Sequence, residues 1–452
     1  MRLFHGKARF WLIIPIAILI AIASYRIAVK RQVDHALRAI KASGYPSTLA
    51  ELDKSYAFVP ANENAALQFI DNYRAISPSR NNHELPVVGN RDLPPLGEPL
   101  PKSMVAAIRK HLDANRQSLE AIDESMKLPR SRYPLDLTAG ASLLLRHLAE
   151  TKSAAQILKL HAIFAADEGN CNLAARDIVD QIAVANTLHR EPILISQLVR
   201  IAILRIAVIT LENVLYKVDL GSEDLQRISK ELQRADQDQA ASFKVGMVGE
   251  RCFGMDWFQK YTPALEAQLG TSEPGFAVLP VLAARRLVGL WDADRLYFLN
   301  FMTRFISVAE LPLPEALNAN AALFAELEKT RRRYYISSTL LPAMEGAFSK
   351  SVETSAALRT AQAGLAIRER IASGTRFPND LQALAASDLK IDDPFTGKPL
   401  LTLHTNHSLL IYSVGRDRID NHGHRPGKEF PTNNDIVFEI RADAIPRRPV
   451  SD

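Results

Sequence analysis

Apolar positions follow a helical period through most of this chain. Between residues 103 and 372 they recur largely at three- and four-residue steps, which predicts a series of amphipathic helices. Two stretches, 193–215 and 276–291, are apolar almost all round, but arginines such as Arg200 and Arg285 interrupt them. Because an arginine at the centre of a bilayer is costly, we predict that both stretches are buried helices of an all-α bundle or irregular solenoid.

The pattern changes after Gly374. A helix is predicted over residues 354–372, and a segment rich in Pro, Gly and Asp follows it. Three short apolar runs, at 400–403, 409–414 and 436–440, then have the length and composition of β-strands. We predict a small three-stranded antiparallel sheet built on the helix. The expected fold class is therefore mainly α, with a small C-terminal α+β domain.

A continuous apolar run occupies the N-terminus. Residues 10–25 would span about 24 Å as a helix, and extension to Val29 gives about 30 Å, the thickness of a bilayer's hydrocarbon core. We predict a transmembrane helix over residues 10–29 that contacts membrane lipid. A cleaved signal peptide is the alternative, but Arg26 and other basic residues follow the run in place of a small-residue cleavage site.

These patterns divide the chain into five segments. Thr48 is a typical helix cap before Leu49, Asn62 is a candidate cap for the next helix, and residues 76–101 show no period. The predicted segments are an N-terminal tail at 1–9, the transmembrane helix at 10–29, juxtamembrane helices and an irregular linker at 30–102, an all-α domain at 103–348, and a helix plus small sheet at 349–452.

Charge gives little information about partners or orientation. The net charge is +5 over 452 residues, and basic residues are interleaved with acidic ones, so no nucleic-acid partner is indicated. Arg2, Lys7 and Arg9 precede the apolar run and five basic residues follow it by Lys41, so the positive-inside count is close to balanced or even leans toward a cytoplasmic body. Charge alone therefore does not orient the body of the protein.

Cysteines and histidines form no metal motif. Cys171 and Cys252 are far apart in unrelated contexts, so we expect buried apolar side chains and not a disulfide or a metal pair. His147 and His161 fall on one helical face but about 21 Å apart along its axis, too far to share a metal ion. We expect these histidines to be ordinary core or surface residues.

The helical region contains one dense polar group. Glu250, Arg251 and Asp256 lie near Cys252 and Trp257 in the sequence. Two carboxylates can serve as general acid and general base, so Glu250 and Asp256 are the candidate catalytic pair. An internal ion pair that links helices is the favoured alternative. Since no Gly-rich phosphate loop or Gly-x-Ser-x-Gly elbow is present, the sequence indicates no catalytic activity.

Side chains with oxygen atoms that could bind a metal ion occur at both ends of the loop at 415–435. Hard oxygen ligands that converge in this way suit Ca²⁺, and an ion there would stabilise a sheet too small to hold itself. A solvated polar loop is the alternative, because Asp and Asn are common turn residues. The oxygen-bearing side chains are Asp417, Asp420, Asn421, Glu429, Asn433, Asn434 and Asp435.

The C-terminal region resembles the globular domain of the major pseudopilin of type II secretion systems. The similar elements are a Gly-Thr-Arg-Phe-Pro turn at 374–378, an Asp-Pro segment at 393–399, Ser-Val-Gly-Arg-Asp at 413–417 and Asn-Asp-Ile at 434–436. The resemblance implies calcium ligands at Asp417 and Asp435, with Asn434 and the carbonyl of Val414 as further candidates. Arg418 stands where the family usually has Gly. The N-terminus lacks the family's processing signal, so filament assembly is not expected.

Nearly the whole chain is similar to a family of uncharacterised, membrane-anchored bacterial proteins. The similarity rests on Thr-Leu-Ala-Glu-Leu at 48–52, Asn-Glu-Asn-Ala-Ala at 62–66, the run at 191–200 and the C-terminal motifs. It implies a single-pass protein of the inner membrane. We expect an envelope interaction or scaffold protein with an extracytoplasmic body, protein partners in the envelope and a link to secretion or trafficking. An enzyme with its site at Glu250 and Asp256 is the alternative.

Overall fold

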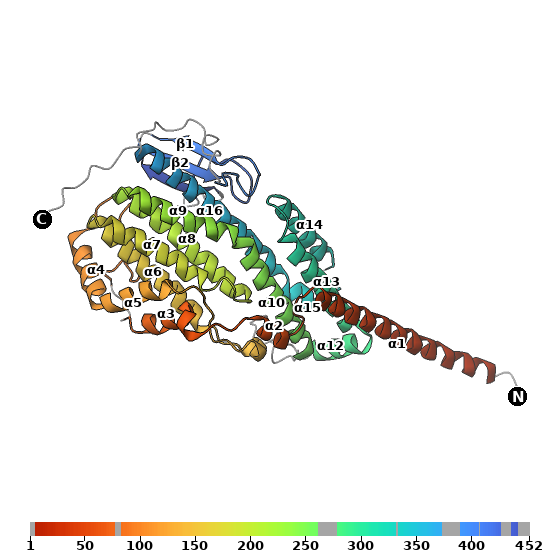
Figure 1. Cartoon of the computed structure of the whole chain (residues 1–452). Helices are drawn as coiled ribbons and strands as arrows, with labels where there is room; N and C mark the ends of the chain where they lie inside the picture. The colour runs from red at the N-terminus through yellow and green to blue at the C-terminus, as the bar shows by residue number, and fades with distance from the viewer. Residues whose placement is uncertain are drawn as a thin grey trace.

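The protein is a mainly helical body with one projecting helix and one small sheet (Figure 1). Helix α1 (His5–Ala42) extends away from the body, and the sheet lies at a distance from it. The computed structural model describes residues 5–76, 83–260, 278–330, 333–372, 389–405, 407–425 and 435–441. The other helices are α2 (Leu49–Ser55), η1 (Ala61–Glu63), α3 (Ala65–Arg74), α4 (Lys102–Ala114), α5 (Arg116–Met126), η2 (Leu137–Ser142), α6 (Arg146–Asp167), α7 (Cys171–Asn186), α8 (Leu194–Lys217), α9 (Ser222–Gln237), α10 (Gln239–Lys260), α12 (Val278–Leu287), α13 (Leu290–Val308), α14 (Glu315–Thr330), α15 (Tyr335–Leu340) and α16 (Pro342–Ala372).

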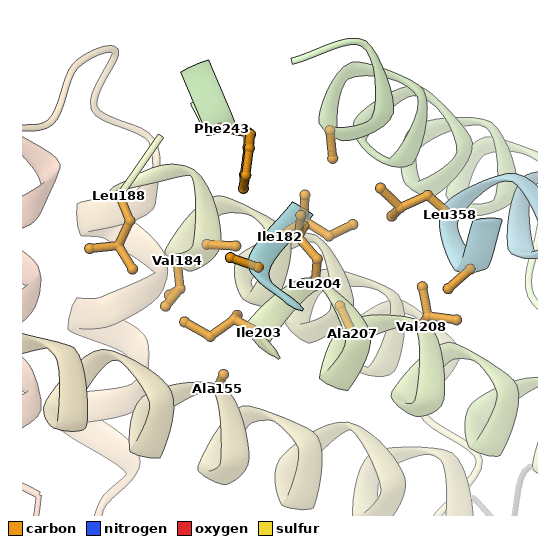
Figure 2. Close-up of a cluster of buried hydrophobic side chains, with 14 of the residues drawn as sticks. Ala155, Ile182, Val184, Leu188, Ile203, Leu204, Ala207, Val208, Phe243 and Leu358 are labelled. Carbon is orange, nitrogen blue, oxygen red and sulfur yellow. The ribbon is translucent and has the colours of Figure 1, made fainter. Parts of the chain in front are cut away.

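Helix α8 lies at the centre of the body. It packs against α6, α7, α10 and α16. Figure 2 shows apolar side chains from these helices converging. The burial of so much apolar surface is the main stabilising term of the fold. Representative side chains, each at most 1% exposed, are Ala155 of α6, Ile182 of α7, Leu204 of α8, Phe243 of α10 and Leu358 of α16.

Within the part of the chain that the structure describes, one helix is long and apolar enough to cross a membrane, and it is α8. The protein buries 61% of this stretch, and the Arg200 side chain in it is 0% exposed, with Nη1 donating to Gln239 Oε1 at 2.6 Å. The prediction of a buried helix over 193–215 is confirmed. The N-terminal helix is not identified as a further candidate among the described residues, so its transmembrane role stays a prediction.

The prediction for 276–291 is wrong in its second half. Helix α12 ends at Leu287, and this side chain is 68% exposed, while Ala283, Ala284 and Arg286 are exposed too. Only from Trp291, which is 8% exposed in α13, does the chain enter the core. The described C-terminal end of α12 is therefore exposed, and not buried as predicted.

Capping side chains fix where the early helices begin. Thr48 caps α2 as predicted, with its hydroxyl accepting from the Glu51 N–H at 3.2 Å. Helix α3 is capped by Asn64 and not by Asn62, because Asn64 Oδ1 accepts from the Ala66 N–H at 3.1 Å. The same Asn64 side chain binds the main chain of Arg132, which connects the helix start to a distant loop.

The predicted three-stranded antiparallel sheet is confirmed, with bounds shifted by about one residue. Its order is β1 (Leu401–His404), β2 (Ser408–Ser413) and β3 (Ile436–Arg441). Ile411 pairs with Phe438, and Phe438 lies directly on Gly364 of α16, where a β-carbon would come within 2.6 Å of the ring. Only glycine permits this close approach.

Helix α16 joins the sheet to the body. It spans Pro342–Ala372 without a break and contacts α8 and α9 as well as β2 and β3. The predicted boundary between residues 348 and 349 therefore falls inside one helix. The sheet is built onto a helix that also belongs to the core of the body.

Helix α1 has two different halves. Its C-terminal half packs on α13, and Val29, Val33 and Ile40 are buried. The preceding residues from Ile14 to Ile27 include large apolar side chains that are about half exposed or more. The predicted span at 10–29 thus ends inside the contact with the body, because Val29 is only 6% exposed.

Candidate functional site

Asp393 connects two of the motifs that carry the pseudopilin resemblance. Its side chain is 2% exposed. Oδ1 accepts hydrogen bonds from the Phe395 N–H at 2.8 Å and the Ser413 hydroxyl at 2.9 Å, and Oδ2 accepts from the Val414 N–H at 3.0 Å. The Asp-Pro turn and the end of β2 therefore form one hydrogen-bonded unit. The Asp393 carboxylate therefore satisfies main-chain donors and links the turn to the end of β2.

The loop after β2 is built from left-handed turns. Two glycines and two larger residues have positive φ: Gly415 at 67°, Arg418 at 58°, His422 at 57° and Gly423 at 71°. Larger side chains adopt this region at a steric cost. The position of Arg418, where the pseudopilin family usually has Gly, is therefore one where the backbone itself favours glycine.

Among the predicted calcium ligands, Asp435 is the one whose side chain is buried and hydrogen-bonded within the loop. The residue is 2% exposed, and Oδ2 accepts from the Asn421 N–H at 3.1 Å and the Gly423 N–H at 2.8 Å. Oδ1 is buried and has no hydrogen-bond partner among the described residues. Burial raises the pKa of this carboxyl, and the nearby Asp420 adds to the rise. A cation beside Oδ1 would satisfy the oxygen.

The structure does not bring the other predicted calcium ligands together with Asp435. Asp417 is exposed, and its Oδ1 accepts from the Ile419 N–H at 3.1 Å within its own turn. The N–H of Val414 is bound to Asp393, and Asn434 lies outside the described residues. No three His, Cys, Asp or Glu side chains are grouped as metal ligands in the described part of the chain. Of the predicted ligands, only Asp435 presents a buried carboxylate oxygen without a described partner, so calcium binding at this loop stays a prediction.

Glu250 and Asp256 do not form a catalytic pair in this geometry. They lie six positions apart on α10, which places them about 120° apart around the helix. Glu250 Oε1 accepts from the Leu194 N–H at 3.0 Å, at the start of α8, and burial raises the pKa of this carboxyl. Asp256 pairs with Lys260 at 3.0 Å. The favoured ion pair between helices is also absent from the described contacts of Glu250 and Asp256, and Arg251 Nη2 donates to the Pro46 carbonyl in the α1–α2 turn.

The cysteines and histidines have ordinary partners. Neither cysteine forms a disulfide; Cys252 is buried as predicted, whereas Cys171 is half-buried. His147 Nε2 lies 3.0 Å from Glu191 Oε1, and His161 Nδ1 lies 3.0 Å from a carboxylate oxygen of Asp177. Each histidine is thus paired separately with a buried carboxylate.

One acidic cluster was not predicted from the sequence. A pocket of ≈ 370 Å³ between α5, α6 and α7 is lined by Asp123, His161, Asp177 and Asp180 among others. Asp180 is 5% exposed and accepts no hydrogen bond from the described residues. Burial raises its pKa to about 8, and Asp123 and Asp177 add to the rise. The sequence does contain a signal, since Asp177 and Asp180 are three positions apart and therefore lie on one face of the helix.

A larger cleft opens between the segment that follows α1 and the body. Its volume is ≈ 1070 Å³, and its lining includes Phe58, His189, Arg190 and Lys244. Phe58 is 79% exposed. Arg190 Nε donates to His189 Nε2 at 3.2 Å, and burial lowers the pKa of His189, which favours the neutral imidazole that accepts this hydrogen bond. An apolar ring and a guanidinium therefore share one accessible surface.

The comparisons with known proteins identify no relative. No family model matches the chain, and neither the curated proteins nor the solved structures contain a match.

Proposed function

We propose that this protein is a single-pass, membrane-anchored scaffold of the bacterial envelope, held in the inner membrane by α1. The supporting observation is the exposure of the N-terminal half of that helix. Ile16, Ile18, Leu19 and Ile20 are 54–65% exposed and lie on successive faces of the helix. Exposed apolar surface of this extent marks a contact with lipid or with another protein.

A comparison of α1 with α8 supports lipid as the contact. Both helices are strongly apolar, but α8 is surrounded by other helices and contains the buried Arg200. The exposed part of α1 projects from the body (Figure 1), and between Phe10 and Tyr25 its sequence has no charged residue. A helix in lipid needs apolar side chains on every face, because its backbone is already hydrogen-bonded internally.

Membrane extraction of the full chain tests the anchor. The double variant Ile16→Asp, Leu19→Asp should move from the alkali-resistant membrane fraction to the soluble fraction, because each carboxylate at the bilayer centre is strongly disfavoured. The matched control is Phe58→Asp, Leu144→Asp, which changes two body residues that are 79% and 69% exposed. Membrane retention of the first variant would contradict the anchor.

We place the body outside the cytoplasm. The pseudopilin resemblance and the calcium-compatible loop favour this side, since extracytoplasmic calcium sites are typically of low affinity and need a calcium-rich medium. Reporter fusions after Lys41 and at Asp452 test the orientation. Reporters that are active only in the cytoplasm at both positions would exclude it.

Calcium is proposed as a ligand of the loop after β2. Added calcium should raise the melting temperature of the full chain, because an ion bound only to the folded state stabilises it by mass action. Asp435→Asn should abolish the shift and Asp417→Ala should reduce it, while Asp113→Ala, an exposed carboxylate in α4, should leave it unchanged. A missing shift, or one that persists in Asp435→Asn, removes the site.

A scaffold acts through protein partners, and the cleft around Phe58 and Arg190 is the surface where we expect one. The cleft combines an exposed aromatic ring with a guanidinium, and both residue types are enriched at the energetic centres of interfaces. Phe58→Ala should release an envelope partner that cross-links to the wild-type chain. Exposed Leu144→Ala serves as the control.

A further inference from the structure

Helix α12 meets α1 at the end of the apolar run. Gly289, between α12 and α13, has a φ of 81°, and a β-carbon there would lie 2.7 Å from Arg26 Cγ and 3.4 Å from Tyr25 Cδ1. The junction of α12 and α13 is therefore pressed against α1 at Tyr25 and Arg26. The apolar run that starts at Phe10 stops at the same level.

The length of the free helix determines how close this junction lies to the bilayer. From Phe10 to Tyr25 the helix rises about 24 Å, whereas the hydrocarbon core is about 30 Å thick. The span cannot be lengthened through Val29, because this residue is buried in the contact with the body. A short span draws the flanking structure into the interface. The body must therefore lie directly on the membrane at the α12–α13 junction.

The exposed C-terminal end of α12 combines an apolar and a basic side chain, as expected for a segment at the membrane surface. Leu287 is 68% exposed, and Arg286 beside it holds its guanidinium 4.5 Å from the Trp291 ring centroid. Arg285 fixes the helix from its other side, with Nη2 donating to the Arg333 carbonyl at 2.7 Å. An apolar side chain next to basic groups on a rigid helix is typical of an interfacial contact.

Charge complementarity favours a bilayer with anionic headgroups. Arg26, Lys30 and Arg31 on α1 are exposed near the same level, and Arg286 is exposed on α12. A cluster of basic residues immediately beside a membrane helix attracts anionic lipid. The opposite charges nearby, Asp34 and Asp292, are balanced in part by Arg295, whose charge interacts with both.

We propose that the C-terminal end of α12 is a second membrane contact, in which Leu287 inserts into the headgroup layer and Arg286 binds anionic lipid phosphates. This inference rests on the proposed anchoring of α1. It makes the body a rigid block that lies on the bilayer and does not move freely above it. It also explains why an apolar helix end is left exposed beside the core.

Nitroxide depth measurements on the full chain in nanodiscs test the proposal. Single cysteines are introduced at Leu287, at Leu19 and at Ile419 in a background of Cys171→Ser and Cys252→Ala, and each is spin-labelled. All three sites are 61–68% exposed in the protein, so labelling leaves the core intact. The measured quantity is the collision rate with oxygen, which concentrates in lipid, relative to that with a water-soluble nickel complex.

The three labels separate the two proposals. We expect a high oxygen-to-nickel ratio at 19, a several-fold lower but still lipid-like ratio at 287, and a fully aqueous ratio at 419. The ratio at 287 should rise when anionic lipid replaces zwitterionic lipid, and Arg286→Gln should remove this rise. A lipid value at 19 with an aqueous value at 287 overturns the second contact and leaves the anchor intact. Aqueous values at both sites overturn the anchor and the inference together.

Discussion

The helical body and the C-terminal sheet share one apolar core, but the sheet region depends in addition on carboxylates that bind main-chain donors. In the body, apolar side chains from five helices meet around α8, and residues such as Leu204 are 0% exposed. In the sheet region, carboxylates bound to main-chain donors connect the pieces. Asp393 links the Asp-Pro turn to β2, Asp435 holds two loop amides, and Glu212 of α8 accepts from the Glu439 N–H of β3 at 2.7 Å.

This difference in how carboxylates are used affects the interpretation of acidic residues in each region. In the sheet, satisfying main-chain hydrogen bonds requires a carboxylate at a defined place, so an acidic motif is first a structural element. In the body, a buried carboxylate without such partners among the described residues, such as Asp180, costs stability. The predictions below test whether this contrast holds, in order of decreasing effect.

The largest effect is expected in the apolar core. Leu204→Ala in α8 should lower the free energy of unfolding by about 2–5 kcal/mol, because it removes buried methyl groups and leaves a cavity. Denaturant unfolding of the full chain in detergent micelles measures the change. Ile209→Ala on the same helix is the matched control, since Ile209 is 41% exposed. Equal losses at the two positions would mean that α8 is not the centre of the core.

Asp180→Asn should stabilise the body by several kcal/mol at pH 8. Burial raises the pKa of Asp180 from 3.8 to about 8. Between these values the folded chain retains a proton that the unfolded chain releases, so the wild-type protein loses stability as the pH rises. The gain from the substitution should therefore be greatest near pH 8 and disappear below the unfolded pKa.

Thermal unfolding of wild type and Asp180→Asn across that pH range measures the effect. Asp113→Asn is the control, because Asp113 is an exposed carboxylate in α4 paired with Arg116 at 2.6 Å. A gain that does not depend on pH would show that the substitution acts through packing and not through the proton.

Asp393→Asn, in contrast, should lower the free energy of unfolding. The amide nitrogen would replace one oxygen that now accepts a hydrogen bond, and a buried donor such as the Val414 N–H would lose its partner. We expect a loss of about 2 kcal/mol, confined to the sheet region. Hydrogen exchange at the amides of β2 and β3 measures it, with the amides of α8 as the internal reference. Equal acceleration in α8 would show that sheet and body unfold as one unit.

The fold was largely predictable because apolar periodicity is a local signal. It located the helices of the body and all three strands, since side-chain period distinguishes helix from strand. It failed at the end of α12, because apolar composition does not reveal whether a side chain such as Leu287 is buried or exposed. It also failed at Asn64, whose capping role depends on Arg132, a residue far away in the sequence.

The candidate sites were less predictable because they depend on tertiary contacts. Spacing in α10 suggested that Glu250 and Asp256 act together, but the helix turns them to different neighbours, Leu194 and Lys260. The loop motif indicated Asp417 and Asp435 equally, although only Asp435 is buried. Asp180 was not predicted as a site residue, because its burial depends on the tertiary fold and cannot be derived from the sequence.

Arg418→Gly should have the smallest effect on stability, and it tests directly whether backbone strain in the loop destabilises the sheet region. Arg418 has a φ of 58°, and its Nη2 donates to Asn318 Oδ1 at 2.9 Å on the surface. Glycine should stabilise the loop by about 1 kcal/mol, because a β-carbon is disfavoured in the left-handed region and the exposed hydrogen bond contributes little.

Arg418→Ala is the control for the lost hydrogen bond. Both variants remove the contact with Asn318, but alanine keeps the β-carbon, so the difference between them isolates the backbone term. Hydrogen exchange of the loop amides, including the Gly423 N–H that binds Asp435, should slow in the glycine variant and not in the alanine variant. If calcium binds the loop, the glycine variant should also bind it more tightly, because a loop already in its folded conformation loses less entropy on binding. Equal exchange in the two variants would show that backbone strain does not limit the stability of the sheet region.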